Sequence, residues 1–388
     1  MDTIAVVGGG LVGSSAAYRL ACHGARVTLV DRADEGQATA AGAGILAPGS
    51  RFVGADALLP LLKHAHAYFP DLLARLADDG EHDTGYEVVG ALHVATTEQQ
   101  ASHLPELLHQ AQQRQAAGFH HVGAARLVDG DAARRLFPAL GGAVLAAVHL
   151  DSAARVDGRA LCEALRRAAR RRGATLLHGD AELLLDGDRA AGVRVDGRIV
   201  AADAVIIAAG AWSARSVSHL AVRLPVGPQR GQLAHLRLPG VDSGRWPSVL
   251  GFHPHYLVTF PADRVVIGAT RENQAGWDHR VTAAGLHEVL DQALRLAPGL
   301  AGATVEEVRV GFRPASPDHN PVLGQVPGVP NAYLATGHGG YGLQVGPWSG
   351  AVVADLVLGR PVGLDLSPFA VGRFDHAVQP TDSTAQAP

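Results

Sequence analysis

Residues 4–13 read IAVVGGGLVG, in which four apolar residues run directly into the pattern G-x-G-x-x-G. The glycines of this pattern are Gly8, Gly10 and Gly13, and an alanine-rich segment follows them. A second apolar run, residues 27–30, ends at Asp31. A strand, a glycine turn, a helix and a second strand in this order predict the opening βαβ unit of a parallel sheet.

The spacing of these residues also indicates what the unit binds. Gly8 permits a tight turn, Gly10 lets a pyrophosphate approach the backbone, and Gly13 lets helix and strand pack closely. Unpaired N–H groups at the start of the helix favour phosphates there. Asp31 is placed to accept hydrogen bonds from ribose hydroxyls and disfavours a 2′-phosphate, which argues against NADP. The pattern predicts NAD or FAD, with a purely structural glycine turn as the alternative.

The composition narrows the class of protein. The 388 residues are 47% hydrophobic, which is enough for a buried core in two domains, and the net charge of −4 gives no basic surplus for nucleic acid. No apolar stretch reaches the roughly 20 residues of a membrane span, and no leader-like segment precedes the first strand, so we expect a cytoplasmic protein. Cys22 and Cys162 do not make a disulfide framework. His253 and His255 lack a further ligand at suitable spacing, so no metal site is expected.

Further along the chain, one segment resembles the strand-glycine element of the N-terminus, and other segments predict a second sheet. An apolar run that begins at residue 204 predicts a strand ended by Gly210, and a second strand-glycine element of this kind favours FAD over NAD. Alternating residues predict antiparallel strands at 256–260 and 265–270. The other predicted elements are a loop of small residues at 37–50, a helix at 58–78, a strand at 333–336, a glycine-rich turn, and a helix at 348–358.

Ordered blocks of sequence carry a family resemblance. Besides the first glycine pattern, these blocks are residues 39–46, 230–232, 267–270, 311–314 with Asp318, and 336–340. With them the chain resembles the D-amino-acid-oxidase-like flavoproteins, in particular the glycine oxidase branch, over nearly all of residues 1–365.

The resemblance implies a mixed α/β and α+β fold. This is a Rossmann-like two-dinucleotide-binding flavoprotein fold, interleaved with an antiparallel-sheet substrate domain, that holds FAD without a covalent bond. The FAD-binding domain is then expected over residues 1–80, 150–220 and 314–375. The substrate domain is expected over 81–149 and 221–313, and the tail 376–388 is expected to be flexible.

The same resemblance assigns cofactor-binding residues by position. Leu11 and Val12 are expected at the pyrophosphate, Asp31 and Arg32 at the ribose and adenine, and Glu182 at the adenine through its backbone. Residues expected along the ribityl chain and the flavin ring are Ala38, Thr39, Ala43, Gly44, Ile45, Gly210, His338, Gly339, Gly340, Tyr341, Gly342, Leu343 and Gln344.

Arg313 is the residue expected to bind a substrate carboxylate, because a guanidinium pairs with that group through two hydrogen bonds. Tyr256 matches a position near the same carboxylate. The alternatives are a structural ion pair for Arg313 and a core position for Tyr256. Gly340 is a departure, since glycine oxidases carry an arginine there, and its small size favours a substrate larger than glycine. Candidates to line this larger pocket are His338, Tyr341, Gln344, His255 and Arg230.

The activity implied by the resemblance is oxidation of a small amine or amino acid of the glycine or D-amino-acid type. Hydride transfer from Cα to flavin N5 gives an imine, which hydrolyses to a keto acid and ammonia, and O2 is reduced to hydrogen peroxide. Two alternatives stay open: a D-amino-acid dehydrogenase that passes electrons to a quinone or carrier, and a flavin-binding subunit of a multi-chain complex. Expected partners are the substrate and O2 or an electron carrier, with a homo-oligomer left open.

Overall fold

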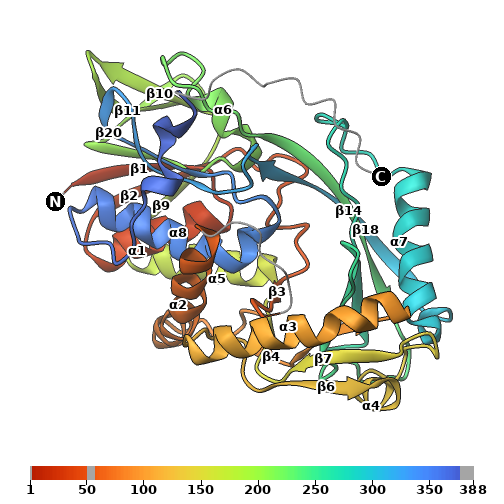
Figure 1. Cartoon of the computed structure of the whole chain (residues 1–388). Helices are drawn as coiled ribbons and strands as arrows, with labels where there is room; N and C mark the ends of the chain where they lie inside the picture. The colour runs from red at the N-terminus through yellow and green to blue at the C-terminus, as the bar shows by residue number, and fades with distance from the viewer. Residues whose placement is uncertain (1, 50–56, 376–388) are drawn as a thin grey trace.

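The computed structural model describes residues 2–49 and 57–375. A six-stranded sheet forms its first layer, in the order β19 (Val322–Val326), β20 (Val329–Thr336), β13 (Ala204–Ile207), β1 (Thr3–Val7), β2 (Arg26–Asp31) and β9 (Thr175–His178). The strands from β20 to β9 run parallel, and β19 is antiparallel at the edge. The Rossmann-like unit predicted at the N-terminus is therefore confirmed (Figure 1).

Helices pack on one face of this sheet. The helix α1 (Leu11–Cys22) contacts both α5 (Gly158–Arg171) and α8 (Gly342–Val357), and α2 (Leu58–Asp78) contacts α8. Small buried residues of α1, such as Ala16 and Ala17, allow this close packing. A three-stranded sheet of β10 (Ala181–Asp186), β11 (Arg189–Val195) and β12 (Arg198–Ala201) packs on the other face, around a second apolar core.

The second large layer is an eight-stranded sheet. Its order is β18 (Thr304–Ala315), β14 (Gly227–Arg237), β17 (Arg264–Gly268), β16 (Tyr256–Phe260), β15 (Ser248–Leu250), β5 (Ala91–Ala95), β7 (Ala146–Leu150) and β6 (Ala125–Asp129). The neighbouring strands pair antiparallel except β15 with β5. The antiparallel pair predicted at 256–270 is confirmed as β16 and β17. The residue bounds predicted for the two domains stay a prediction.

Three further helices cover this sheet, as Figure 1 shows. The helices α4 (Gly130–Leu136) and α7 (Ala283–Leu296) share an apolar core with it, and α3 (Glu98–Ala116) shares another. A small sheet of β3 (Ile45–Leu46), β8 (Ala154–Arg155) and β4 (Glu87–Val88) lies next to the loop that follows β2. That loop reaches the second sheet, where the N–H of Phe312 donates to the carbonyl of Gly36 at 2.8 Å.

The structure differs from the predicted elements at two points. The last helix was predicted from residue 348 but begins at Gly342, because burial of Gln344–Trp348 outweighs the helix-breaking tendency of its glycines and Pro347. The strand predicted from residue 204 up to Gly210 ends earlier, at Ile207, and a 3-10 turn, Gly210–Trp212, and the short helix α6 (Ser213–Ser216) follow. The predicted flexible tail, 376–388, and residue 50 of the predicted loop lie outside the described residues.

Two absences predicted from the sequence can be compared with the described part of the chain. Within residues 2–49 and 57–375, no helix has both the length and the apolar character needed to cross a membrane. In the same ranges, no group of three or more His, Cys, Asp or Glu side chains is arranged to hold a metal ion.

Candidate cofactor and substrate site

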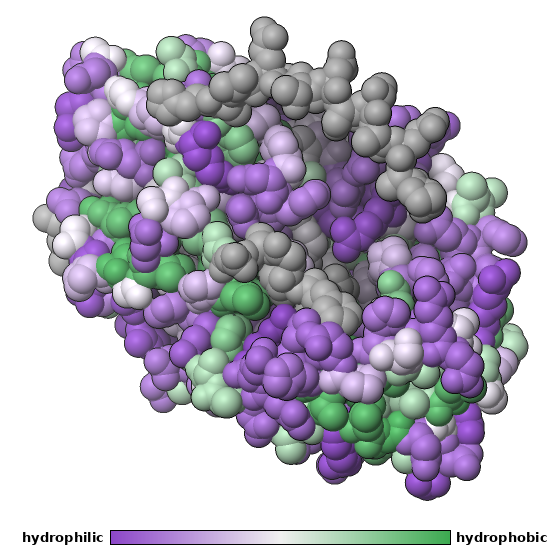
Figure 2. Space-filling model, in the orientation of Figure 1, coloured by the Kyte–Doolittle hydropathy of each residue, from purple (hydrophilic) through white to green (hydrophobic). Residues whose placement is uncertain are grey.

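A cavity of about 580 Å³ lies at the carboxyl ends of β1, β2 and β13 and extends to the second sheet. Figure 2, in the orientation of Figure 1, shows a hollow in the surface of the molecule, with mainly hydrophilic residues around it. Ligands of open α/β sheets bind at this edge of the strands. The cavity collects all the predicted cofactor-binding residues except Gly13 and Tyr341.

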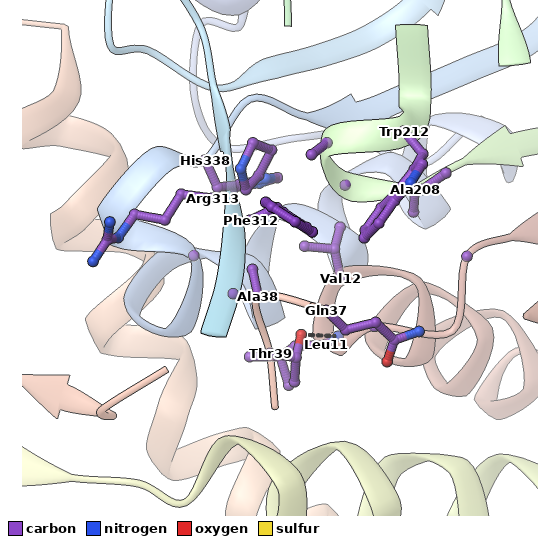
Figure 3. A pocket seen from close by; sticks show the side chains of 18 of the residues that line it. Leu11, Val12, Gln37, Ala38, Thr39, Ala208, Trp212, Phe312, Arg313 and His338 are labelled. Carbon is purple, nitrogen blue, oxygen red and sulfur yellow. Dashed lines mark hydrogen bonds between the residues drawn. The ribbon is translucent and has the colours of Figure 1, made fainter. Parts of the chain in front are cut away.

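The glycine turn at residues 8–10 and the start of α1 form the first end of the cavity, called the phosphate cradle here because the sequence predicts phosphate groups at this place. A Cβ at Gly8, whose φ is +99°, would overlap the carbonyl of Ala208, and a Cβ at Gly13 would overlap the carbonyl of Gly8. Gly13 therefore lies behind the cavity and serves the packing of α1 on β1, as its spacing predicted. The N–H of Leu11 donates to Oγ1 of Thr39 at 3.0 Å (Figure 3). The N-cap residue Gly10 has no side chain to cap the helix, and the first turn of α1 has no acidic residue, so this helix start is suited to an anion.

Next to this cradle, charged side chains surround the end of β2. The Asp31 carboxylate accepts from the Arg166 guanidinium at 2.8 Å and from the Gln37 amide at 3.2 Å. Arg32 donates to Asp34 at 2.8 Å and to Asp180 at 3.2 Å. These side chains hold Asp31 and Arg32 in place on the cavity wall.

Glu182 completes this end of the cavity from β10. Its side chain is exposed, and one carboxylate oxygen lies 3.7 Å from the Arg194 guanidinium. Glu182 lines the cavity wall, and the resemblance expects its backbone to contact the adenine there.

The middle of the cavity is lined by small residues and aromatic rings. The loop from Ala38 to Ile45 contains Gly44, where a Cβ would overlap the carbonyl of Val156. Trp212 and Phe312 meet edge to face, with ring centroids 6.0 Å apart (Figure 3). Such a wall of backbone and rings fits a flat, extended ligand.

His338 lies at the start of the glycine-rich turn before α8. It is 2% exposed, and its Nε2 has no hydrogen-bond partner among the described residues. Burial lowers the pKa of His338 to about 4, so the imidazole is neutral at neutral pH. A buried polar atom without a partner is costly. His338 together with the phosphate cradle therefore fits a bound dinucleotide that offers polar groups here.

Arg313 and Tyr256 line the same cavity from the second sheet. Arg313, on β18, points away from Trp212 (Figure 3) and donates to the carbonyl of Thr270 at 3.1 Å. Its guanidinium lies over Gly231, where a Cβ would be only 2.5 Å from Nη1. The ring of Tyr256 lies over Gly268 in a similar way. Both polar side chains thus occupy space that the neighbouring strands leave free.

Three predicted pocket residues lie elsewhere, which corrects the prediction. Tyr341 packs against the core around α1 and α2 and does not line the cavity. His255 lies 3.5 Å from Glu288, outside the cavity lining. Arg230 is drawn into ion pairs with Glu272 and Asp278. For His255 and Arg230 the partner side chains come from distant parts of the chain, so sequence position alone did not reveal them.

Other cavity residues were missed by the sequence analysis. Trp212, Phe312 and Arg271 line the cavity, and Arg166 holds Asp31. Arg271 directly follows the strand predicted at 265–270, and this position next to a cavity-lining strand end was a usable signal. Nη2 of Arg271 lies 3.7 Å from the point that a Cβ on Gly340 would occupy.

Comparison with known proteins agrees with this geometry. The family model for DAO, described as FAD dependent oxidoreductase, matches residues 3–356. The uncharacterized oxidoreductase YurR of Bacillus subtilis is 44% identical over 370 residues, covering 95% of this chain and 98% of that protein. Glycine oxidase of Pseudomonas aeruginosa is 31% identical over 373 residues, with coverage of 95% and 98%.

Among solved structures, iminodiacetate oxidase from Chelativorans sp. BNC1 matches with a TM-score of 0.91 and 40% identity, over 95% of this chain and 98% of that one. The two-sheet flavoprotein architecture, the family resemblance and FAD as cofactor are thereby confirmed. The chain belongs to the DAO family of FAD-dependent oxidoreductases.

Proposed function

We propose that this protein oxidises the carbon–nitrogen bond of a small amine that carries a carboxylate, with O2 as the electron acceptor and hydrogen peroxide as a product. The observation that carries the proposal is that Arg313 and Tyr256 line one cavity together with the phosphate cradle and the turn at His338. Relatives named glycine oxidase and iminodiacetate oxidase support a substrate of this size and charge.

In this proposal the residues of the chain mainly position the substrate. Arg313 pairs with the carboxylate through its planar fork, and the Tyr256 hydroxyl donates a further hydrogen bond. FAD, when bound, supplies the acceptor for the hydride that leaves the substrate carbon. The oxidised substrate is an imine, and water then releases an oxo acid and ammonia or an amine. Fixing the carboxylate orients the C–H bond, so positioning supplies much of the rate enhancement.

The start of α8 has an electrostatic part in the proposal. The helix begins at Gly342, next to the neutral His338, and its first turn has no acidic residue. The free N–H groups of a helix start stabilise negative charge that develops nearby. Because glycines precede the helix, the backbone there is accessible to a ligand.

The experiment is anaerobic stopped-flow mixing of the yellow protein with glycine, sarcosine, iminodiacetate and a panel of D- and L-amino acids. We expect one class of substrate to bleach the flavin absorbance, and admission of air to restore it with formation of peroxide. Bleaching that air does not reverse quickly would contradict the oxidase and favour a dehydrogenase that uses a carrier. Absence of bleaching with every amine would overturn the proposed substrate class.

A further inference from the structure

Arg271 differs from the other arginines on the cavity wall. Arg32 is paired with Asp34, Arg194 with Glu182, and Arg215 with Asp180. The side chain of Arg271, by contrast, makes no hydrogen bond, ion pair or ring contact with any residue in 2–49 or 57–375. It is exposed and lies on the cavity wall. A guanidinium there is available to an anionic ligand.

The absence of a side chain at Gly340 leaves room for the guanidinium of Arg271. Nη2 of Arg271 lies 3.7 Å from the point that a Cβ on Gly340 would occupy, so a long side chain at 340 would compete for this space. The turn that carries Gly340 leads into α8, and Gly339, Gly340 and Gly342 all line the cavity. The guanidinium of Arg271 thus reaches the same turn as the proposed cofactor contacts.

Arg271 and Arg313 belong to one end of the cavity. Arg313 donates to the carbonyl of Thr270, the residue directly before Arg271, at 3.1 Å. The carboxylates that line the cavity, Asp31, Asp34, Asp180 and Glu182, come from β2, β10 and the segments that follow β2 and β9. Two positive charges therefore lie at the Tyr256 end, where no carboxylate of the described residues lines the wall.

We propose that Arg271 binds a second carboxylate, and that the preferred substrate is an aminodicarboxylate whose nitrogen lies between two carboxylate-bearing arms. This inference rests on the proposed function, with Arg313 holding the carboxylate of the arm that is oxidised. Arg271 then holds the carboxylate of the other arm. Two-electron oxidation would break a C–H bond of the first arm, with FAD, when bound, as the acceptor of the hydride. Water adds to the resulting C=N bond, which releases an oxo acid and the amine that carries the second arm.

The test uses two ligands that differ by one carboxylate and have no C–N bond to oxidise. Calorimetric titration of the holoenzyme compares thiodiacetate with (methylthio)acetate. We expect thiodiacetate to bind at least about tenfold more tightly, as for a charge-assisted contact, and Arg271→Gln to remove that advantage. Arg271→Lys, which keeps the positive charge, should keep part of the affinity advantage of thiodiacetate. The matched control is Arg135→Gln, at an exposed arginine on α4 far from the cavity, which should keep all of it.

Two outcomes separate this inference from the proposed function. Equal affinities for the two thioethers, or a preference that Arg271→Gln leaves intact, would overturn the role of Arg271 even if amines are oxidised. A preference that depends on Arg271, in a protein that oxidises no amine, would support the dicarboxylate site while the proposed oxidation fails. In turnover, Arg271→Gln should raise the KM for iminodiacetate by a larger factor than the KM for sarcosine, which carries one carboxylate only.

Discussion

His66 and His121 bring their Nδ1 atoms to 2.7 Å from each other inside the protein. Nε2 of His66 lies 3.1 Å from the amide oxygen of Gln344, which only accepts, so this Nε2 carries the proton. Nδ1 of the neutral His66 then accepts from His121, and Nε2 of His121 accepts from the Tyr86 hydroxyl at 3.0 Å. All these hydrogen bonds form together only while both imidazoles are neutral.

This pair predicts a loss of stability in acid. Burial lowers the pKa of His66 to about 3 and that of His121 to about 4, whereas an unperturbed histidine titrates near 6.5. Between pH 6.5 and 4 the unfolded chain therefore binds more protons than the folded protein. We expect the free energy of unfolding contributed by the pair to fall as pH decreases through this window and to be constant above it.

Urea unfolding at pH 7.5 and pH 5 measures this effect. His121→Asn should lower stability at pH 7.5 and reduce the difference between the two pH values. His253→Asn, at an exposed histidine, is the control and should keep the wild-type difference. An equal pH difference in His121→Asn and in the wild type would contradict the assignment of the effect to the pair.

A second prediction concerns the bond between Thr39 and the start of α1. Oγ1 of Thr39 accepts from the Leu11 N–H at 3.0 Å, so Thr39→Val leaves this donor without its partner. We expect FAD binding or folding to weaken by about 1–3 kcal/mol, while Thr39→Ser, which keeps the hydroxyl, stays close to the wild type. Retained flavin after gel filtration and a fluorescence titration of the apoprotein with FAD measure the change.

A third prediction tests the packing of the glycine turn. Gly13→Ala would place a Cβ onto the carbonyl of Gly8, and backbone there cannot move without shifting β1 or α1. We expect a loss of about 1–3 kcal/mol in stability, the usual cost of overpacking, with reduced flavin content. Gly302→Ala is the matched control, because nothing lies within 4 Å of the Cβ it would add. Equal thermal unfolding of the two variants would rule out this packing role.

The parts of the fold that the sequence predicted well are those determined by neighbouring residues. The glycine pattern at residues 8–13 and the alternating strands at 256–270 depend on short-range geometry, so their pattern is visible in the chain. The predicted start of α8 was wrong because the true start depends on contacts with residues far away in the sequence. The Ser15 hydroxyl donates to the carbonyl of Pro347 at 2.6 Å, and α1 buries the first turns of α8. No local pattern reports such a contact.

The prediction of the site residues was limited in the same way, by contacts between residues that are far apart in the sequence. Asp31 and Thr39 were found because they follow a recognisable strand or belong to a matching block, although their roles toward FAD stay predictions. Arg230 was assigned to the pocket, yet Glu272 and Asp278, over 40 positions away, pair with it. Arg271 was missed although it directly follows a predicted strand, because its closeness to Gly340, which is far away in the sequence, is set by the fold.

A fourth prediction addresses Arg313 itself. Arg313→Ala removes the guanidinium proposed to hold the substrate carboxylate, and we expect kcat/KM to fall by the equivalent of about 2–5 kcal/mol. Arg313→Lys keeps the charge but loses the planar fork, so an intermediate loss is expected. Steady-state kinetics with the best amine, alongside the flavin spectrum as a check of cofactor content, give the answer. Unchanged kinetics in Arg313→Ala would remove this residue from the substrate site.

The position of Arg313 can also be changed without altering the residue. A Cβ on Gly231 would lie 2.5 Å from its Nη1, and because the guanidinium is the end of a flexible side chain, Gly231→Ala should displace it rather than unfold β14. We expect KM to rise about tenfold, which corresponds to about 1.4 kcal/mol of lost binding, with little change in melting temperature.

Gly227→Ala on the same strand is the matched control for this displacement, since nothing lies within 4 Å of its added Cβ. A rise in KM shared by both variants would point to a general effect on β14. A rise confined to Gly231→Ala, and absent when Arg313 is already alanine, would show that Gly231 acts through Arg313. That second comparison is a double-mutant cycle, and it separates the position of the guanidinium from the shape of the cavity wall.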